Sequence, residues 1–325
     1  MPIRPSLDQI REAETQLRRY FPATPLVAAR SLSRAGCAVH LKVETGLPTG
    51  SFKPRGALHA LATRLTRGPV DEVVASSTGN HGAAVAWAAK TLGVRATIFL
   101  PANPNPVKRK NIADLGAGIV ESGGQDLADA FLQTKEYAQR PGVYFLNDAT
   151  DPDLTAGPGT IGLEVVAQLP ALTAIYVPMG DTALIRGVGA AVKQLAPQVR
   201  VIGVQAERAP SYYLSWKQGR AVPTETCDTC ADGLATRTPE EKNVAAIREL
   251  VDDVALVSEE EMIAAMGRLY RDEGVVAEPA GAAATAAFLK DGNASGQVVL
   301  LVTGRNVTDA LRLRAGLPTS QGNSD

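Results

Sequence analysis

Cysteine, histidine and aromatic residues are scarce in this chain of 325 residues, which has three cysteines, three histidines and 5% aromatic residues. So few cysteines, odd in number, argue against a disulfide framework and indicate a reducing compartment, so we expect a cytoplasmic protein. Cys227 and Cys230 form a Cys-x-x-Cys pair, but no second pair of cysteines or histidines accompanies it. Because a structural zinc site normally has four ligands, we interpret the pair as two thiols in a loop.

The sequence also lacks an excess of charge of one sign and long apolar runs. Its formal net charge is -1 and its charged residues are evenly spread, unlike those of nucleic-acid-binding proteins. No apolar run approaches the roughly 18 residues of a membrane span. The first 20 residues are charged and amphipathic, and they lack the apolar core of a secretory signal. We therefore expect neither nucleic acid nor a membrane as a partner.

Strand-like and helix-like segments alternate along nearly the whole chain, which is typical of a mainly parallel α/β sheet. The block 72–149 is expected to form a small α/β domain, inserted in a large domain made of 1–71 and 150–325. The stretch 207–240 is interpreted as irregular, and the polar tail after Gly316 is expected to be disordered. The expected strands are 39–44, 73–76, 96–100, 118–121, 143–146, 174–178, 201–205, 254–257 and 298–302, and expected helices include 83–92, 107–115, 125–139, 259–273 and 280–290.

One motif, Thr49-Gly50-Ser51-Phe52-Lys53-Pro54-Arg55-Gly56-Ala57, follows the expected strand 39–44. A helix begins within the motif, and Ser51 is suited to cap it. Lys53 then lies in the first turn of this helix, where the electropositive N-terminus and burial favour a neutral, nucleophilic amine. A lysine that forms a Schiff base needs such an environment. On this stretch alone, however, a solvated lysine is the commoner outcome.

Four loops rich in small and hydroxyl residues each follow an expected strand: the lysine motif, 77–82, 180–184 and 303–306. In an open α/β sheet, ligands bind at the loops that follow the carboxyl ends of the strands. Glycine lets a backbone N–H approach a ligand closely, and helix starts favour anions. The loop 180–184 is therefore a candidate phosphate site, although strand-to-helix turns use the same residues for structural reasons.

The motifs Ser51-Phe52-Lys53 and Ser77-Thr78-Gly79-Asn80-His81-Gly82, in this order, resemble those of fold-type II pyridoxal-phosphate enzymes of the serine/threonine dehydratase family. The resemblance covers about residues 20–315 and includes the segments 24–26, 156–160, 231–234 and 278–282. It implies a tryptophan synthase β-like α/β fold with two domains of open parallel sheets flanked by helices. It also implies that pyridoxal 5'-phosphate binds in the large domain, at the cleft between the two, and that the protein is a homodimer.

The resemblance also implies roles for individual residues. Lys53 matches the Schiff-base lysine, which binds the cofactor aldehyde and later takes the substrate Cα proton. Phe52 matches a residue packed on the cofactor ring, Asn80 one that bonds the ring hydroxyl, and Thr303 one that faces the pyridine nitrogen. The residues that match the phosphate loop are Gly180, Asp181, Thr182, Ala183 and Leu184. The predicted substrate contacts are Ser77, Thr78, Gly79, His81 and Gly157.

The hydroxyl partner of the pyridine nitrogen bears on the reaction. A threonine leaves this nitrogen largely neutral, which favours loss of a β-leaving group over long-lived carbanion chemistry. The resemblance therefore implies an ammonia-lyase that performs β-elimination on serine or threonine and releases a 2-oxo acid and ammonia. The alternatives are a β-replacement or threonine-synthase-like enzyme, an amino-acid racemase, and a non-catalytic protein that binds the cofactor.

The phosphate loop departs from the family pattern, since Asp181, Thr182 and Ala183 replace three glycines. A carboxylate beside a phosphate dianion is repulsive unless it points away, and the Thr182 hydroxyl offsets this by donating a hydrogen bond. Arg305 stands where relatives have glycine. Our hypothesis is that Arg305 pairs with Asp181 or contacts an acidic substrate.

A third departure concerns metal. Some relatives bind a divalent cation through acidic residues that follow the strand equivalent to 201–205. The corresponding positions here hold Gln205, Ala209 and Ser211. Because hard cations prefer carboxylates, we predict no metal site.

Overall fold

The computed structural model describes residues 4–319, apart from Thr78, Asn103, Asn105 and residues 123–126. Its larger sheet has six strands in the order β1-β2-β10-β7-β8-β9. Only β1 is antiparallel to its neighbour, and the other five strands run parallel. The strands are β1 (Leu26–Ala28), β2 (Cys37–Val43), β7 (Leu172–Pro178), β8 (Arg200–Ala206), β9 (Asp253–Val257) and β10 (Gly296–Val302).

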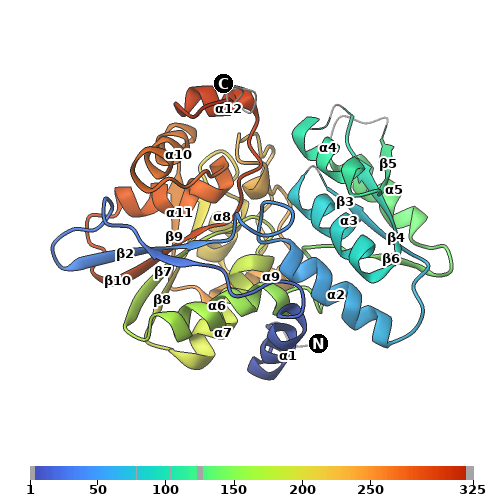
Figure 1. Ribbon diagram of the computed structural model, residues 1–325, viewed down its shortest axis with the longest axis horizontal. Helices are drawn as coiled ribbons and strands as arrows, with labels where there is room; N and C mark the ends of the chain where they lie inside the picture. The colour runs from blue at the N-terminus through green and yellow to red at the C-terminus, as the bar shows by residue number, and fades with distance from the viewer. Residues whose placement is uncertain (1–3, 78, 103, 105, 123–126, 320–325) are drawn as a thin grey trace.

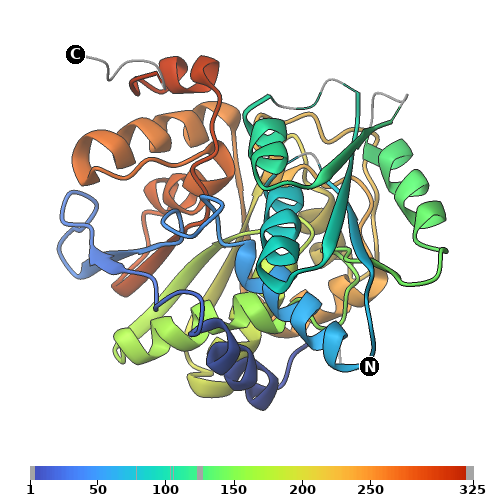
Figure 2. The same ribbon diagram turned by 45° about the vertical axis from the view of Figure 1, so that its right-hand side comes forward.

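The smaller sheet has four parallel strands in the order β5-β4-β3-β6, and the segment 72–145 supplies all of them. Both views place it beside the six-stranded sheet (Figure 1, Figure 2). Its elements are β3 (Glu72–Ser76), α3 (Asn80–Leu92), β4 (Arg95–Leu100), α4 (Pro106–Asp114), β5 (Gly118–Glu121), α5 (Leu127–Tyr137) and β6 (Val143–Phe145).

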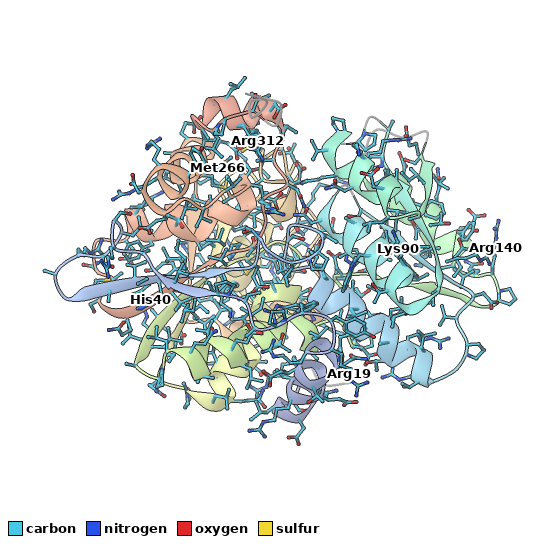
Figure 3. The ribbon with its side chains drawn as sticks, viewed as in Figure 1. Arg19, His40, Lys90, Arg140, Met266 and Arg312 are labelled. Atoms are coloured by element: carbon cyan, nitrogen blue, oxygen red, sulfur yellow. The ribbon has the colours of Figure 1, made fainter. Side chains whose placement is uncertain are left out.

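Helices cover both faces of the larger sheet, with α10 and α11 on one side and α6 and α7 on the other (Figure 1). Met266 of α10, labelled in Figure 3, is fully buried in the core on its side. The remaining helices are α1 (Leu7–Leu17), α2 (Pro54–Thr66), α6 (Ala156–Gln168), α7 (Ala183–Leu195), α8 (Ser211–Gln218), a 3-10 turn (Asp232–Leu234), α9 (Glu241–Leu250), α10 (Glu259–Glu273), α11 (Pro279–Lys290) and α12 (Asp309–Arg314).

Successive residues of β10 point into two different hydrophobic cores. Val298 and Leu300 lie in the core beneath α10 and α11, whereas Val299 and Leu301 lie in the core beneath α6 and α7. A parallel strand buried on both faces has apolar residues at every position. This burial explains the unbroken apolar run at residues 298–302, and β10 is one of the two central strands of the sheet.

Helix α2 links the two sheets. Its residues Ala57, Leu58 and Leu61 are buried in one core with residues of β3, α3 and β4. The core of the smaller sheet therefore includes α2, a helix that precedes this sheet in the chain. The predicted domain boundaries, at 71/72 and 149/150, stay a prediction.

Nine predicted strands correspond to β2 through β10, with ends that differ by at most two residues, so the predicted α/β class is confirmed. The prediction that 207–240 is irregular was wrong, because α8 lies within it. Tyr212 on α8 is fully buried, and its hydroxyl accepts hydrogen bonds from Glu240 N and Asn243 Nδ2. Tertiary packing, rather than a sequence pattern, stabilises so short a helix.

No helix in the described part of the chain is long and apolar enough to cross a membrane. The tail predicted to be disordered falls mostly outside the described residues.

Candidate active site

The lysine motif is held against the carboxyl end of β10. Phe52 N donates a hydrogen bond to Thr303 O at 2.9 Å, and Ser51 forms an antiparallel bridge with Gly304. Gly50 has φ +70°, a conformation that glycine adopts without strain. These contacts place Lys53 at the edge of the sheet where ligands of α/β proteins bind.

The predicted cap of the following helix was wrong. Helix α2 begins at Pro54, Lys53 is its N-cap residue, and no side chain caps its first turn. Proline is well suited to the first helical position, because its missing N–H would have no partner there. Ser51 instead lies 3.4 Å from the hydroxyl of Thr49.

A buried ion-pair cluster fixes the first turn of α2. Arg55 is fully buried and lies 2.8 Å from both Glu44 and Glu164, and Lys42 lies 2.5 Å from Glu164. Although burial raises the pKa of Glu164, Arg55 and Lys42 lower that pKa to about 2. Both carboxylates are thus paired, and their bonds to Arg55 fix the backbone two residues after Lys53.

Lys53 lines a cavity of about 230 Å³, whose walls include the loops that follow several strands. Gly157 is not among the residues that line this cavity, and its predicted contact with substrate stays a prediction. A Cβ on Gly157 would lie 2.2 Å from Arg55 O, so glycine is needed there for close packing of α6 on α2. Thr78 lies outside the described residues. The other predicted site residues do line the cavity: Phe52, Lys53, Ser77, Gly79, Asn80, His81, Gly180, Asp181, Thr182, Ala183, Leu184 and Thr303.

Asp148 is a cavity residue that the sequence analysis missed. Its Oδ2 lies 2.6 Å from Lys53 Nζ, and both side chains are 19% exposed. Burial raises the pKa of the Asp148 carboxyl, but Lys53 lowers that pKa well below its usual range, so Asp148 is a carboxylate. Asp148 lies just after β6, and this position at the carboxyl end of a strand was a signal that could have identified it.

His81 is a neutral packing residue in this cavity. Its Nε2 hydrogen bonds to Leu146 O at 2.9 Å, and burial lowers its pKa. Its Nδ1 is buried without a hydrogen-bond partner among the described residues and lies 4.0 Å from Asp148 Oδ2. A neutral histidine bonded to the backbone is suited to holding the loop, and its predicted contact with substrate stays a prediction.

A second polar network closes the other side of the cavity. Asn80 Nδ2 donates to Glu278 Oε1 at 2.5 Å, and Asn80 Oδ1 accepts from Asn306 Nδ2 at 2.8 Å. Burial raises the pKa of Glu278, whose side chain faces the cavity and does not cap α11. Lys108, also missed, is buried and bonds Asp232 at 2.8 Å. The network joins the start of α3 to the start of α11.

The phosphate loop has an unusual backbone. A Cβ on Gly180 would lie 2.2 Å from Gly233 O, so this position requires glycine. Thr182 has φ +67° and is the only non-glycine residue with positive φ in the described part of the chain. It precedes α7 without a side-chain cap, so among the described residues no side chain accepts from the first N–H groups of α7. Asp181 accepts a hydrogen bond from the Thr236 hydroxyl at 3.1 Å.

The hypothesis that Arg305 pairs with Asp181 was wrong, whereas its alternative, a contact with an acidic substrate, stays a prediction. Its side chain is exposed and does not line the cavity, whereas Asp181 lines the cavity and bonds Thr236. The arginine next to the phosphate loop is Arg186, which is buried on α7. Its Nε donates to Thr182 Oγ1 at 3.0 Å and its Nη2 to Ala149 O at 2.9 Å. A single sequence offers no signal for this contact between helix and loop.

The positions considered for metal make other contacts. Gln205 Oε1 accepts from Tyr213 N, and the Ser211 hydroxyl donates to Thr236 O. Among the described residues, no group of three or more His, Cys, Asp or Glu is arranged to hold a metal ion. The absence of a metal site stays a prediction. Cys227 lines the cavity, and burial raises the pKa of the Cys230 thiol to about 12.

Comparison with known proteins identifies the family. Residues 17–304 match the family described as pyridoxal-phosphate dependent enzyme. The chain belongs to this family. It is therefore dependent on pyridoxal phosphate, and its fold is that of the fold-type II enzymes, as the resemblance implied.

Several relatives carry more specific names. The chain is 36% identical over 301 residues to an L-threonine ammonia-lyase of Geobacter sulfurreducens, covering 92% of this chain and 75% of that protein. It is 37% identical over 306 residues to an L-threonine ammonia-lyase of Thermotoga maritima, covering 93% and 76%. Among solved structures, a threonine deaminase of T.th. has a TM-score of 0.87 at 34% identity, covering 93% of this chain and 99% of that one. Maize serine racemase has a TM-score of 0.89 at 29% identity, covering 96% of each chain.

The chemistry of the cavity fits pyridoxal phosphate. The cavity offers a primary amine from Lys53, an aromatic ring from Phe52, an amide from Asn80 and a hydroxyl from Thr303. The uncapped start of α7 is suited to an anion. Within the phosphate loop 180–184, the carboxyl of Asp181 is the group that opposes a phosphate. Burial and Asp148 raise the pKa of Asp181 to about 6, which makes its neutral form accessible.

Proposed function

We propose that this protein is an ammonia-lyase that acts on a β-hydroxy amino acid, such as threonine or serine, and releases a 2-oxo acid and ammonia. The L-threonine ammonia-lyases at 36% and 37% identity support this reaction. The observation that carries the proposal is the Lys53 amine, which faces a cavity bordered by hydroxyl, amide and glycine residues from separate loops. That arrangement suits removal of a proton from a small amino acid.

The cofactor is proposed to bind with Lys53 at its aldehyde carbon and Phe52 against its ring. Asn80 holds the ring hydroxyl, Thr303 faces the pyridine nitrogen, and the loop 180–184 holds the phosphate. When bound, pyridoxal phosphate withdraws electrons from the amino acid and makes its Cα–H acidic. The protein then has to hold the amino acid and move its protons.

Lys53 is the base for the Cα proton, and Asp148 stabilises the ammonium that Lys53 becomes. The two side chains are 2.6 Å apart, and Asp148 keeps its negative charge. A hydrogen bond to a charged group is stronger than one between neutral groups. Asp148 thus lowers the energy of the state in which Lys53 carries the proton.

The substrate carboxylate is proposed to bind at the start of α3, beside Ser77 and Gly79. Helix starts favour anions. A Cβ on Gly79 would lie 2.4 Å from Lys108 Cδ, so Lys108 packs directly behind this loop. Its ammonium lies 2.8 Å from Asp232 and 3.8 Å from Glu278, and these two contacts fix its position. His81 supports the loop from the backbone side through Leu146.

The test is an assay of the purified protein with pyridoxal phosphate and L-serine or L-threonine, in which 2-oxo acid, ammonia and the D-amino acid are measured. Release of equal amounts of 2-oxo acid and ammonia is expected. Formation of the D-amino acid alone would favour a racemase. Product only in the presence of an added nucleophile would favour β-replacement, and no turnover of any amino acid would favour the non-catalytic alternative.

We also propose a homodimer in the cytoplasm, with the large domain formed by 1–71 and 150–325. The family resemblance supports the dimer, and the small number of cysteines supports the reducing compartment. Light scattering coupled to size-exclusion chromatography tests the dimer, and a monomer mass at micromolar concentration would contradict it.

A further inference from the structure

We propose that this protein binds the cofactor phosphate in a charge-compensated site, in which Arg186 supplies positive charge and Asp181 takes up a proton as the phosphate enters. The inference rests on the proposed placement of the cofactor and is independent of which amino acid reacts. It explains two departures of this chain from the glycine-rich phosphate loop of its family.

Arg186 is a buried cation that forms no direct ion pair with a carboxylate among the described residues. Its two bonded acceptors are neutral, namely the Thr182 hydroxyl at 3.0 Å and Ala149 O at 2.9 Å. Within the described ranges no carboxylate lies within 4.0 Å of its guanidinium, and burial lowers its pKa. Burying a charge is unfavourable unless a counter-charge compensates for it. A phosphate bound in the adjacent cavity would provide that counter-charge.

Thr182 connects Arg186 to the cavity. Its hydroxyl oxygen accepts the bond from Arg186 Nε, so its own proton remains available to a second acceptor. Thr182 also lines the cavity, where the phosphate loop is expected to bind its ligand. Its left-handed backbone is rare for a β-branched residue, and such strain is typical of functional sites. The bond from Arg186 helps to hold this conformation.

Asp181 is surrounded by groups from five parts of the chain. It faces Asp148 from the loop after β6, Lys53 from the turn before α2, and Arg186 from α7. Tyr212 of α8 interacts with it electrostatically, and the Thr236 hydroxyl donates to its Oδ1. Burial, followed by Asp148, raises its pKa to about 6. A phosphate dianion is a further negative neighbour and would raise this pKa again.

The charge balance favours a neutral Asp181 when phosphate is present. With Asp181 ionised, Lys53 and Arg186 balance Asp148 and Asp181, and the group has no net charge. With Asp181 protonated, the same four side chains carry one net positive charge. The phosphate therefore binds more tightly to the protonated form, so binding above pH 6 requires uptake of a proton.

The first experiment measures ligand binding to the full chain, freed of cofactor, by calorimetry in two buffers of different ionisation enthalpy. The probe is pyridoxine 5'-phosphate, which has the ring and the phosphate but no aldehyde to react with Lys53. At pH 8 the wild type should take up close to one proton more than the Asp181→Asn variant. The variant should also bind about a hundredfold more tightly at pH 8, which is two pH units above the Asp181 pKa. Equal uptake and equal affinity in both proteins would overturn the role of Asp181.

The second experiment compares pyridoxine 5'-phosphate with pyridoxine, which lacks the phosphate. Arg186→Met should lose at least about tenfold in affinity for the phosphorylated ligand, since it removes a charged hydrogen-bond donor, and should bind pyridoxine unchanged. Arg305→Met is the matched control and should bind both ligands as the wild type does. Equal weakening of both ligands in Arg186→Met would overturn the role of Arg186.

If Arg186→Met does not fold, as judged by circular dichroism, Arg186→Lys is measured instead. This variant keeps the charge and should keep the preference for the phosphorylated ligand, and loss of that preference would count against the proposal. Wild-type protein that binds neither ligand would contradict the cofactor placement itself. Proton-linked phosphate binding without turnover would leave this inference intact and would remove only the proposed reaction.

Discussion

The amine of Lys53 lies 2.6 Å from Oδ2 of Asp148, and this ion pair joins the turn after β2 to the loop after β6. The two residues belong to segments 95 positions apart, attached to different sheets. Both side chains are 19% exposed and face the same cavity. The pair therefore depends on how the two sheets are arranged, and several predictions concern it and its surroundings.

Replacing Lys53 with alanine should remove the visible absorption band of the bound cofactor. Because a positioned base contributes roughly a hundredfold to ten-thousandfold in rate, 2-oxo acid release should fall by about a thousandfold or more. Absorbance spectroscopy and the oxo-acid assay check this. Lys90→Ala, at an exposed lysine on α3, is the control and should behave as the wild type. An unchanged band in Lys53→Ala would exclude Lys53 as the attachment point.

Replacing Asp148 with asparagine should lower kcat by about tenfold to a hundredfold with little change in KM. The reason is that asparagine has no negative charge with which to stabilise Lys53 once Lys53 has taken up the proton. Steady-state kinetics with the best substrate measure both constants. Asp153→Asn is a suitable control, since Asp153 lies on the same loop and pairs with the exposed Arg67. A rise in KM at constant kcat would instead indicate a contact with substrate.

Replacing Gly180 with alanine should weaken cofactor binding, because the added Cβ would lie 2.2 Å from Gly233 O and must displace the phosphate loop. Fluorescence titration of cofactor-free protein gives the dissociation constant. At Gly46 an added Cβ has no neighbour within 4 Å, so Gly46→Ala should bind cofactor normally. Normal binding by Gly180→Ala would mean that the loop adjusts freely.

Two substitutions of Glu278 distinguish loss of its negative charge from loss of its hydrogen bond to Asn80. Burial raises its pKa, and glutamine resembles the neutral acid, so Glu278→Gln should keep kcat within about threefold. Glu278→Ala leaves the amide of Asn80 without its acceptor, and its kcat should fall by about tenfold or more. The ratio of the two kcat values is the measurement. Equal losses would show that the negative charge of Glu278 is required.

The buried cluster beneath Lys53 gives a prediction on stability. The pKa of Glu164 is about 2 in the folded state and 4.5 when unperturbed, so its pairing contributes about 3 kcal/mol at pH 7. Because the pKa of Glu164 is lowered on folding, its pairing stabilises the folded state fully above pH 4.5. This contribution decreases as the pH falls toward 2, and about 1 kcal/mol of it is lost at pH 4.

Urea unfolding of Glu164→Gln and the wild type at pH 7 and pH 4 tests this prediction. The difference in free energy of unfolding should be about 3 kcal/mol at pH 7 and smaller at pH 4. Glu121→Gln removes an exposed partner of Arg109 and should cost less than about 1 kcal/mol at either pH. A pH-independent difference for Glu164→Gln would contradict the linkage.

The order of the elements and the loops around the cavity could be predicted, because each strand has its own local pattern. Each apolar run predicts a strand, and the small residues after it predict a loop, without reference to any other segment. Asp148, Lys108 and Arg186 were not predicted, since each gains its role from a contact with a distant segment. Arg305 was proposed as a partner of Asp181 because it is a charged residue where relatives have glycine. The fold directs its side chain to solvent instead.

Helix α8 and Gly157 illustrate the same limit. The aromatic residues of 211–218 have no helical pattern strong enough to be recognised, and the helix depends on burial of Tyr212. Gly157 belongs to a motif shared with relatives, but its use here is the close approach of α6 to the backbone at Arg55. Resemblance identified the position, and only packing shows what the position does.

The central place of β10 has a consequence for how the protein is made. This strand is the last of the ten to leave the ribosome, yet β2 and β7 pair with it from opposite sides. Contacts between distant segments form slowly, and unpaired strand edges expose a nascent chain to aggregation. The lysine motif is synthesised early, but its turn is fixed only when Phe52 and Ser51 bond to Thr303 and Gly304. The site therefore assembles only after residues 303 and 304 have been synthesised.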